Sequence, residues 1–490
     1  MVQHQLEVLI KSEIPLIVIE STEENQVVDV LLSLKPVYER PLFKWTLTDG
    51  IQRIDRDLPP QKLFSQPTEA LAHIKSVSTP GVYVLADLHP FLDEPMHVRL
   101  LKDIALKFHE LGHTLILLSH ALEVPVEIMK LSAKLDIALP ERREIEKIVR
   151  EEAQSWLASS GSKVQASSEN LQLLVRNLTG LTRSDVRRLA RNAIFDDGAI
   201  TTSDIPAINE TKYQLLSEQG NMHFEYDTAQ FSDIAGFNGL KNWLNERKPF
   251  FNGDSGVGNL PAPKGMLLLG VQGCGKSLAA KAVAGSWHAP LLRLDFGALY
   301  NKFYGETERN LREALQTAEV MAPCVLWLDE IEKGISSGSD EGGPATRMLG
   351  TLLTWMAEKD APVFIVATAN DIEALPPELV RKGRFDEIFF VDLPNDDIRF
   401  KIFDIHLKRQ GVDVSNFDFK RLIEESVGFS GAEIEQAVIS AFYTAHAQNV
   451  ELDQALLHAE LRKTQPLSVV MSEKIDYLRE WASTRTVSCE

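Results

Sequence analysis

The segment Gly270-Val-Gln-Gly-Cys-Gly-Lys-Ser277 has the residue types and the spacing of a loop that binds phosphate groups. Its glycines let backbone N–H groups turn toward phosphate oxygens, and the N-terminus of a following helix adds partial positive charge. In such a loop the lysine reaches the β- and γ-phosphates, and the hydroxyl binds Mg²⁺. The sequence therefore predicts Mg²⁺ on Ser277 and ATP on Gly270, Gln272, Gly273, Cys274, Gly275, Lys276, Ser277 and Leu278.

Asp329 and Glu330 follow the apolar run Cys324-Val-Leu-Trp-Leu328, which is typical of a strand buried on both faces. Asp329 at this strand end can hold Mg²⁺, and Glu330 can polarise a water for in-line attack on the γ-phosphate. Asn370 follows another apolar run, Val363-Phe-Ile-Val-Ala367, and can orient that water or contact the γ-phosphate. We expect it to position the water. The alternative is that the two acids only cap a helix. Because the carboxyl ends of parallel strands face one crevice, we expect these side chains beside the phosphate loop.

Arg381 and Arg384 flank a Lys-Gly turn beyond this crevice. Arginines placed in this way can reach the γ-phosphate of a neighbouring subunit, where they accelerate the reaction by about 10³–10⁵-fold. The alternative is that both are ordinary surface arginines. We expect them to complete the site of an adjoining copy of the chain.

The elements that must position these residues follow from apolar periodicity. The phosphate loop lies between an apolar run and a helical pattern, and the acids and Asn370 each follow a buried run. A Gly/Ser-rich stretch, residues 336–343, predicts a mobile loop. The predicted strands are at 266–269, 291–294, 324–328 and 363–367. This alternation predicts an α/β fold with a parallel sheet.

Residues 231–490 resemble the AAA family of ATPases, whose motifs occur here in the family's order. The resemblance implies a parallel-sheet P-loop NTPase module of the AAA+ kind with a helical lid, and ATP hydrolysis with Mg²⁺. It also implies assembly into a homo-oligomeric ring, expected to be a hexamer. Arg381 and Arg384 match the paired arginine fingers of this family.

Two further segments resemble nucleotide contacts of the family. Phe231-Ser-Asp-Ile-Ala-Gly236 is similar to the segment whose Asp233 and Gly236 would lie against the adenine. Gly428-Phe-Ser-Gly-Ala-Glu433 is similar to the lid turn, and the residues that would contact the nucleotide there are Gly431 and Ala432.

Leu299-Tyr-Asn-Lys-Phe-Tyr-Gly-Glu306 is similar to the family's loop that presents an aromatic side chain to a central pore. Phe303, Tyr304 and Gly305 would then grip an extended protein substrate as it is threaded. The alternative is that the two aromatic side chains pack beside the next helix. A different function also stays open, in which ATP gates a binding switch, a regulator docks on the first part of the chain and nothing is threaded.

Residues 1–140 repeat the plan without its chemistry. Ile14-Pro-Leu-Ile-Val-Ile19 predicts a strand, but it leads into Glu20-Ser-Thr-Glu-Glu24, which has no glycine or lysine and places acids where phosphate would lie. The run ending at Asp87 resembles the acid-tipped strand, with Leu88 in place of the second acid. We therefore expect a degenerate AAA-like α/β module without a P-loop over 1–140.

The rest of the chain divides by internal likeness. Gly180-Leu-Thr-Arg-Ser-Asp185 matches Gly428–Glu433, and each precedes a helical pattern. We expect the helical lid of the first module at 141–205, a linker at 206–230, the AAA large subdomain at 231–394, and the AAA lid with the C-terminal segment at 395–490.

This architecture resembles a plastid and cyanobacterial AAA family named after hypothetical chloroplast reading frame forty-six. The resemblance implies a plastid stroma or a cyanobacterial cytosol, and a link to photosynthetic carbon use. No residue by itself shows that link.

His109-Glu-Leu-Gly-His113 has the spelling of a zinc protease motif and is a remote alternative. Zinc would need His109 and His113 on one helical face with Glu110 beside the metal-bound water. Gly112 is a natural helix stop, and Thr114 begins an apolar run, so we expect His113 to leave that face.

The composition of the chain limits the kinds of molecule that it is expected to bind. The 490 residues carry a formal net charge of −19, which argues against a broad grip on nucleic acid or anionic lipid. The three cysteines are too scattered for a disulfide framework and suit a reducing compartment. No apolar run approaches the roughly 18 residues of a membrane span, and residues 1–20 show no secretory signal. The expected partners are further copies of the chain and a protein substrate or regulator.

Overall fold

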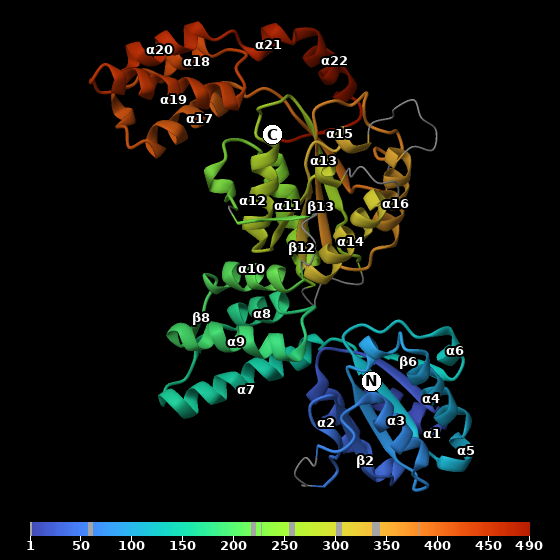
Figure 1. The fold of residues 1–490 in the computed structure, drawn as a ribbon. Helices are drawn as coiled ribbons and strands as arrows, with labels where there is room; N and C mark the ends of the chain where they lie inside the picture. The colour runs from blue at the N-terminus through green and yellow to red at the C-terminus, as the bar shows by residue number, and fades with distance from the viewer. Residues whose placement is uncertain are drawn as a thin grey trace. The chain divides into compact units, whose positions relative to one another are not determined.

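The computed structural model describes residues 2–56, 62–216, 222–226, 228–253, 260–299, 306–335, 344–381 and 383–490. By internal contacts the chain forms two units. The first is made of residues up to Glu141 with Thr182–Asp185, and the second of Arg142–Leu181 and Val186–Glu490. Each unit contains a largely parallel β-sheet with helices packed on it (Figure 1).

The first unit is built on a sheet in the order β3-β2-β4-β5-β1-β6. Neighbouring strands run parallel except β2 and β3. The strands are β1 (Leu16–Glu20), β2 (Leu42–Thr46), β3 (Gly50–Arg53), β4 (Val82–Ala86), β5 (Thr114–Ser119) and β6 (Ser132–Asp136). β4 and β5 are buried along their whole length, as expected for strands that are covered on both faces.

Helices cover both faces of this first sheet. Leu16 and Val18 of β1 belong to one apolar cluster and Ile17 and Ile19 to another, because successive side chains of a strand point to opposite faces. The helices are α1 (Val2–Lys11), α2 (Glu24–Tyr38), α3 (Pro67–Ser76), η1 (His89–Phe91), α4 (Pro95–Leu106), α5 (Phe108–Leu111) and α6 (Val126–Met129).

A helical segment begins the second unit. It contains α7 (Arg142–Ser160), α8 (Ser168–Asn177), α9 (Arg183–Asp197) and α10 (Asp204–Leu216), with the short pair β7 (Gln165–Ala166) and β8 (Ala199–Ile200). The expected helical face of α9 is confirmed, since its apolar side chains are buried in one cluster.

The expected linker at 206–230 needs correction. α10 continues to Leu216 because Ile205 and Ile208 are buried, an apolar spacing that sequence reasoning overlooked. β9 (His223–Glu225) then pairs antiparallel with a strand of the second sheet. The region therefore contains a packed helix and an edge strand.

The helical segment packs on the module that follows it in the chain. The Lys212 side chain is buried, and its Nζ donates a hydrogen bond of 2.5 Å to Thr179 O. Gly180 approaches Val320 so closely that a Cβ there would lie 2.4 Å from the Val320 oxygen. Arg176 Nη2 donates to Trp287 O at 3.2 Å. By contacts these helices thus belong to the second unit.

The second sheet has the order β15-β14-β10-β13-β12-β11-β9 and is parallel except at the β9 edge. Its other strands are β10 (Gly265–Gly270), β11 (Leu291–Leu294), β12 (Cys324–Leu328), β13 (Val363–Ala369), β14 (Glu387–Val391) and β15 (Val487–Ser488). All four strands predicted for this region are confirmed. The parallel arrangement confirms the predicted α/β fold class.

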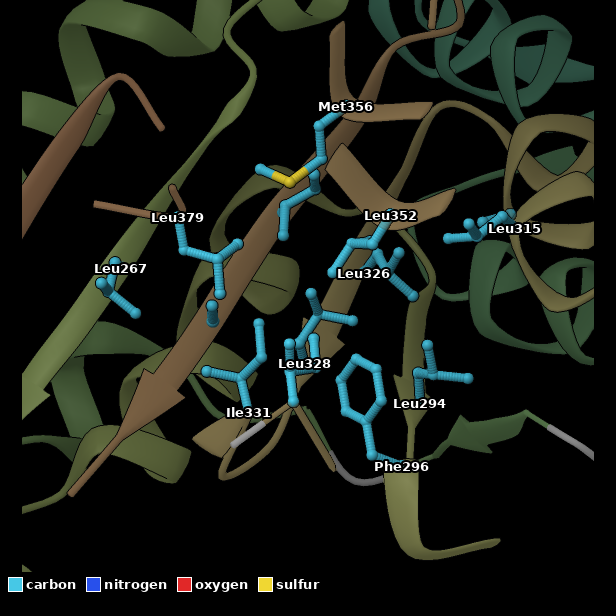
Figure 2. Packing of buried hydrophobic residues seen from close by; sticks show 14 of the residues in the cluster. Leu267, Leu294, Phe296, Leu315, Leu326, Leu328, Ile331, Leu352, Met356 and Leu379 are labelled. Carbon is cyan, nitrogen blue, oxygen red and sulfur yellow. The ribbon is translucent and has the colours of Figure 1, made fainter. Parts of the chain in front are cut away.

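Two apolar clusters hold this sheet between its helices. Figure 2 shows one of them, in which Leu326 and Leu328 of β12 pack with Leu352 and Met356. The helices are η2 (Phe231–Asp233), α11 (Asn238–Asn252), α12 (Lys276–Trp287), α13 (Phe296–Leu299), α14 (Glu306–Met321), α15 (Glu332–Ile335) and α16 (Pro344–Glu358).

A helical lid follows β14. It contains α17 (Asp396–Arg409), η3 (Val414–Asn416), α18 (Phe419–Glu425), α19 (Gly431–Ala447) and α20 (Gln454–Lys463), which share an apolar cluster around Phe403 and Leu422. After α21 (Leu467–Val470) and α22 (Ser472–Ala482), the chain returns to the sheet as β15.

Candidate active site

The phosphate loop connects β10 to α12 at the carboxyl end of the sheet. Gly273 and Gly275 have φ values of 76° and 89°, a left-handed conformation that favours glycine. A Cβ on Gly273 would lie 3.0 Å from Ser430 Oγ and 3.1 Å from Ala432 Cβ of the lid. The loop therefore exposes its backbone in a narrow space between sheet and lid, at the N-terminus of a twelve-residue helix.

Lys276 is the cation of this loop. Its side chain is buried, and Nζ donates to Gly270 O at 2.9 Å and to Val271 O at 2.8 Å. Burial lowers the pKa of Lys276 to about 8, and burial raises the pKa of the neighbouring Cys274 thiol to about 12. The carbonyl partners carry no formal charge, so the Lys276 ammonium can still pair with an anion such as phosphate.

The acids and Asn370 meet at the neighbouring strand ends. Asn370 Nδ2 donates to Glu330 Oε1 at 2.9 Å. Thr368 Oγ1 donates to Asp329 Oδ1 at 2.9 Å and accepts from Glu330 N at 3.0 Å. Glu330 has a φ of 46°, a left-handed conformation that is costly for a side chain other than glycine. The expectation that these side chains lie close together at this edge is confirmed.

Sequence reasoning missed three residues that hold this constellation. They are Thr368, Arg293 and Glu332. Arg293 Nη2 lies 3.0 Å from Asp329 Oδ2, and Glu332 Oε1 accepts a hydrogen bond from Asn370 N at 3.0 Å. Burial raises the pKa of Glu332. The signal for Arg293 was present in the sequence, since it is the one charged residue within the apolar run Leu291–Leu294.

A cavity of about 820 Å³ joins the loop, the acids and the lid, a volume within the usual range for small-molecule sites. Asp233, the loop residues from Gln272 to Leu278, Asp329, Glu330 and Asn370 all line it, as do Gly431 and Ala432. The lid also contributes residues that sequence reasoning did not name, among them Ile398, Ile402, Ile405, His406, Arg409 and Glu435.

Neither Gly236 nor Gly270 is among the residues that line this cavity. A Cβ on Gly236 would lie 2.4 Å from Glu490 Oε1, so the Glu490 side chain occupies the space beside it. A Cβ on Gly270 would lie 2.0 Å from Val391 O. Gly270 therefore allows close contact with β14, and Gly236 faces the end of the chain.

Residues Ser488–Glu490 form part of the cavity wall. Phe237 N donates to Glu490 Oε1 at 2.8 Å, and Leu240 N donates to Cys489 O at 3.1 Å. Both N–H groups belong to the first turn of α11 and its N-cap, where they have no partner within the helix. The tail thus satisfies the start of the helix that follows Asp233.

The two arginines lie outside this cavity. Arg381 is exposed, whereas Arg384 is half-buried and its Nη1 donates to Leu353 O of α16 at 2.7 Å. Phe303, Tyr304 and Gly305, and the stretch 336–343, lie outside the described residues.

The zinc protease motif does not form a metal site. α5 ends at Gly112, whose φ of 65° terminates the helix, and His109 is exposed. His113 is fully buried, with its Nε2 2.8 Å from Val77 O and its ring edge-on to Tyr83. Burial lowers the pKa of His113. The two histidines are directed to different environments, so the metalloprotease alternative is wrong.

Comparison with protein families and relatives agrees with the geometry. The model of the ATPase family associated with various cellular activities (AAA) matches residues 266–393. Models of the N-terminal and the second domain of SpoVK-like AAA ATPases match residues 2–137 and 143–219.

Similar proteins cover nearly the whole chain. AAA domain-containing protein ycf46 of Guillardia theta is 35% identical over 481 residues, or 97% of this chain and 94% of the relative. The ycf46 protein of Pyropia yezoensis is 35% identical over 484 residues, or 97% and 96%. The ATP-dependent zinc metalloprotease FtsH of Helicobacter pylori is 32% identical over 236 residues, or 46% and 37%. Within the described ranges, no helix has the length and apolar character needed to cross a membrane. The chain belongs to the AAA family of ATPases.

Proposed function

We propose that the chain hydrolyses ATP, with Mg²⁺, in the cavity between the second sheet and its lid. The observation that carries this proposal is the hydrogen bond between Asn370 and Glu330 beside Asp329 and Thr368, in the cavity that the phosphate loop also lines. A carboxylate positioned next to a phosphate-binding loop can activate water for attack on a phosphoryl group.

Each side chain then has a defined role. Lys276 and the backbone N–H groups of the loop bind the phosphates, and the lid residues Gly431 and Ala432 close over the nucleotide. Ser277 and Asp329 would hold Mg²⁺. When bound, this ion would neutralise part of the negative charge of the phosphates. Glu330 accepts the proton of the attacking water.

Both oxygens of the Glu330 carboxylate are engaged, Oε1 by Asn370 and Oε2 by an ion pair with Lys333. Each carboxylate oxygen still has a second lone pair, so a water molecule can donate to Glu330 beside these partners. Asn370 sets the direction of the Glu330 carboxylate, and this is how it positions the water.

The test of the base is Glu330→Gln. We expect ATP binding to persist and turnover to fall by about 100-fold or more, because an amide cannot accept the proton. Glu332→Gln is the matched control, since an amide oxygen still accepts from Asn370 N, and its turnover should stay within a few-fold of the wild type. Comparable turnover in Glu330→Gln and the wild type would remove Glu330 from this role.

We further propose that the chain acts as a homo-oligomeric ring, expected to be a hexamer, in which Arg381 and Arg384 of one copy complete the site of the next. Support comes from the exposure of Arg381 and from the position of both arginines outside the cavity of their own chain. Arg384 is anchored to α16 by its bond to Leu353 O, so Arg381 is the better placed of the two to reach a neighbour.

Mixing two inactive variants tests this sharing of sites. Glu330→Gln lacks the base but keeps the arginines, and a double Arg381→Ala/Arg384→Ala variant keeps the base. If arginines act between subunits, mixed oligomers regain part of the ATPase activity that neither variant has alone. A mixture without recovery, or full activity of the double variant as a monomer, contradicts the shared site.

The substrate proposal follows from the family. We propose that hydrolysis drives remodelling or threading of a protein, with Phe303, Tyr304 and Gly305 as the gripping residues, in a plastid stroma or a cyanobacterial cytosol. A role in photosynthetic carbon use stays a prediction of the resemblance. Phe303→Ala separates threading from a binding switch. Lost remodelling with near-normal ATP hydrolysis supports threading, and retained biological activity supports the switch.

A further inference from the structure

The first sheet, which lacks a phosphate loop, has its own group of metal-ligating side chains at its carboxyl edge. Asp87 directly follows β4 and His120 directly follows β5, and these two strands are paired neighbours, with Ala86 opposite Leu118. His89 begins the short helix η1 two residues after Asp87. The pairing of β4 with β5 therefore brings Asp87 close to His120, which lies 33 positions later in the sequence.

The spacing of these three side chains suits a shared ion. One ligand atom from each lies within 4.8 Å of the other two, and Asp87 Oδ1 is 3.9 Å from His89 Nδ1. Two ligands on a tetrahedral zinc lie about 3.4 Å apart, given metal–ligand bonds of about 2.0–2.2 Å. Asp87 and His120 are exposed, so modest side-chain rotation can close the remaining gap.

His89 supplies an independent observation. Its Nδ1 is buried and has no hydrogen-bond partner within the part of the chain that the structure describes. Its ring stands edge-on to that of His120, with centroids 4.7 Å apart. A buried polar atom without a partner is costly, and a bound ion at this place would satisfy it.

We propose that Asp87, His89 and His120 bind a divalent transition-metal ion, of which Zn²⁺ is the best representative. Two imidazoles and one carboxylate favour zinc, cobalt, nickel or ferrous iron over Mg²⁺ and Ca²⁺, which prefer oxygen ligands. The carboxyl edge of an open parallel sheet is the usual place for a ligand. This site is separate from the proposed ATP site and from the His109-Glu-Leu-Gly-His113 motif.

Three protein ligands leave a coordination position open, as in zinc sites that accept a water or an external group. Asp87 and His120 face solvent, so that position is accessible to a fourth ligand from outside this cluster. Through this position, the ion could bind an external ligand group on the first unit, which lacks a phosphate loop.

The test is zinc binding by the full chain, stripped of metal by a chelator and kept in excess Mg²⁺ and ADP so that the ATP site does not compete for zinc. We expect one Zn²⁺ per chain by calorimetry, and a melting temperature that rises on Zn²⁺ addition. His120→Ala and Asp87→Asn, both at exposed positions, should each weaken Zn²⁺ binding at least tenfold, as should His89→Ala. Circular dichroism without metal checks that each variant is folded.

His109→Ala is the matched control, because His109 is an exposed histidine of the same unit outside the cluster. It should bind Zn²⁺ like the wild type. Failure of the wild type to retain Zn²⁺, or equal affinity in His120→Ala, Asp87→Asn and the wild type, overturns the proposal. ATP turnover does not enter this test, so its result is distinguishable from that of the proposed function.

Discussion

The two sheets of this chain share one strand order but differ in chemistry. In the first sheet β6-β1-β5-β4-β2 follow one another, and in the second the order is β14-β10-β13-β12-β11. In the first sheet β1 lies between β5 and β6, and in the second sheet β10 lies between β13 and β14. The difference lies at the strand ends, where β10 leads into a glycine-rich loop and β1 leads into Glu20-Ser-Thr-Glu-Glu24. The same strand order is therefore kept in a sheet whose first strand is not followed by a glycine-rich loop.

The acid-tipped strands show the same contrast in finer detail. Ala86 pairs with Leu118, and Leu328 pairs with Ala367, so Asp87 and Asp329 occupy equivalent positions. The left-handed residue differs between the tips, because it is Asp87 itself in the first sheet and Glu330, the residue after Asp329, in the second. After Asp87 the first sheet has the buried Leu88 where the second has Glu330. The two strand tips therefore differ in backbone geometry as well as in the second acid.

The largest expected effect separates the two loops. Lys276→Ala should lower ATP turnover by about 100-fold or more, because it removes the cation that we propose binds the phosphates. Glu20→Ala, at the end of the equivalent strand β1, should leave turnover unchanged. Phosphate release by the two purified variants measures both effects. A comparable loss in Glu20→Ala would show that the first module takes part in nucleotide chemistry.

The next effect tests the strands beside the acids. Thr368→Val removes the hydroxyl that bonds both Asp329 and Glu330 N, and kcat should fall about 10- to 100-fold, which corresponds to about 1.5–3 kcal/mol for a hydrogen bond to a charged group. Ser119→Ala is the equivalent change in the first sheet, where Ser119 Oγ bonds only the nearby Ala121 O in the described structure. Its kcat should not change, and a drop there would argue against the distinction between the sheets.

A smaller effect is expected at Arg293, which pairs with Asp329 in the second sheet. Arg293→Gln should lower the Mg²⁺ concentration needed for half-maximal ATPase activity about three- to fivefold, because the guanidinium charge no longer competes with the metal for the Asp329 carboxylate. Arg293→Lys keeps a positive charge and should behave like the wild type. An increased Mg²⁺ requirement in Arg293→Gln would mean that Arg293 supports metal binding.

The smallest effect concerns the C-terminal tail, for which the first sheet has no counterpart among the strands described. Glu490→Ala removes the carboxylate that accepts from Phe237 N at the start of α11, an interaction with the strength of a helix cap. The KM for ATP should rise about two- to fivefold with kcat unchanged. Glu480→Ala, an exposed acid on α22, is the control. An unaltered KM in Glu490→Ala would limit the tail to a structural role.

The features that could be predicted from the sequence are those that a single short segment of the chain determines. The phosphate loop and the strands with continuous apolar runs were predictable because one short segment determines each of them, as at Met266–Leu269. The meeting of Glu330 with Asn370 followed from the rule that parallel strand ends share an edge. The end of α5 at Gly112 was predictable because glycine favours a left-handed helix end.

Contacts between distant segments were not predictable. Glu490 lies beside Gly236 because β15 pairs with β14, and no local sequence pattern predicts that pairing. His406 on α17 of the lid lines the same cavity as the phosphate loop, although the two are far apart in the sequence. α10 was missed because a polar composition hid its buried Ile205 and Ile208.

The most direct test of the central claim, that only the second of the two sheets binds ATP, is the number of ATP molecules bound per chain. Equilibrium binding to the Glu330→Gln variant, which we expect to bind ATP and to turn it over very slowly, should give one ATP per chain. Adding Lys276→Ala to that variant should abolish binding. Two ATP molecules per chain, or binding that survives Lys276→Ala, would contradict the account.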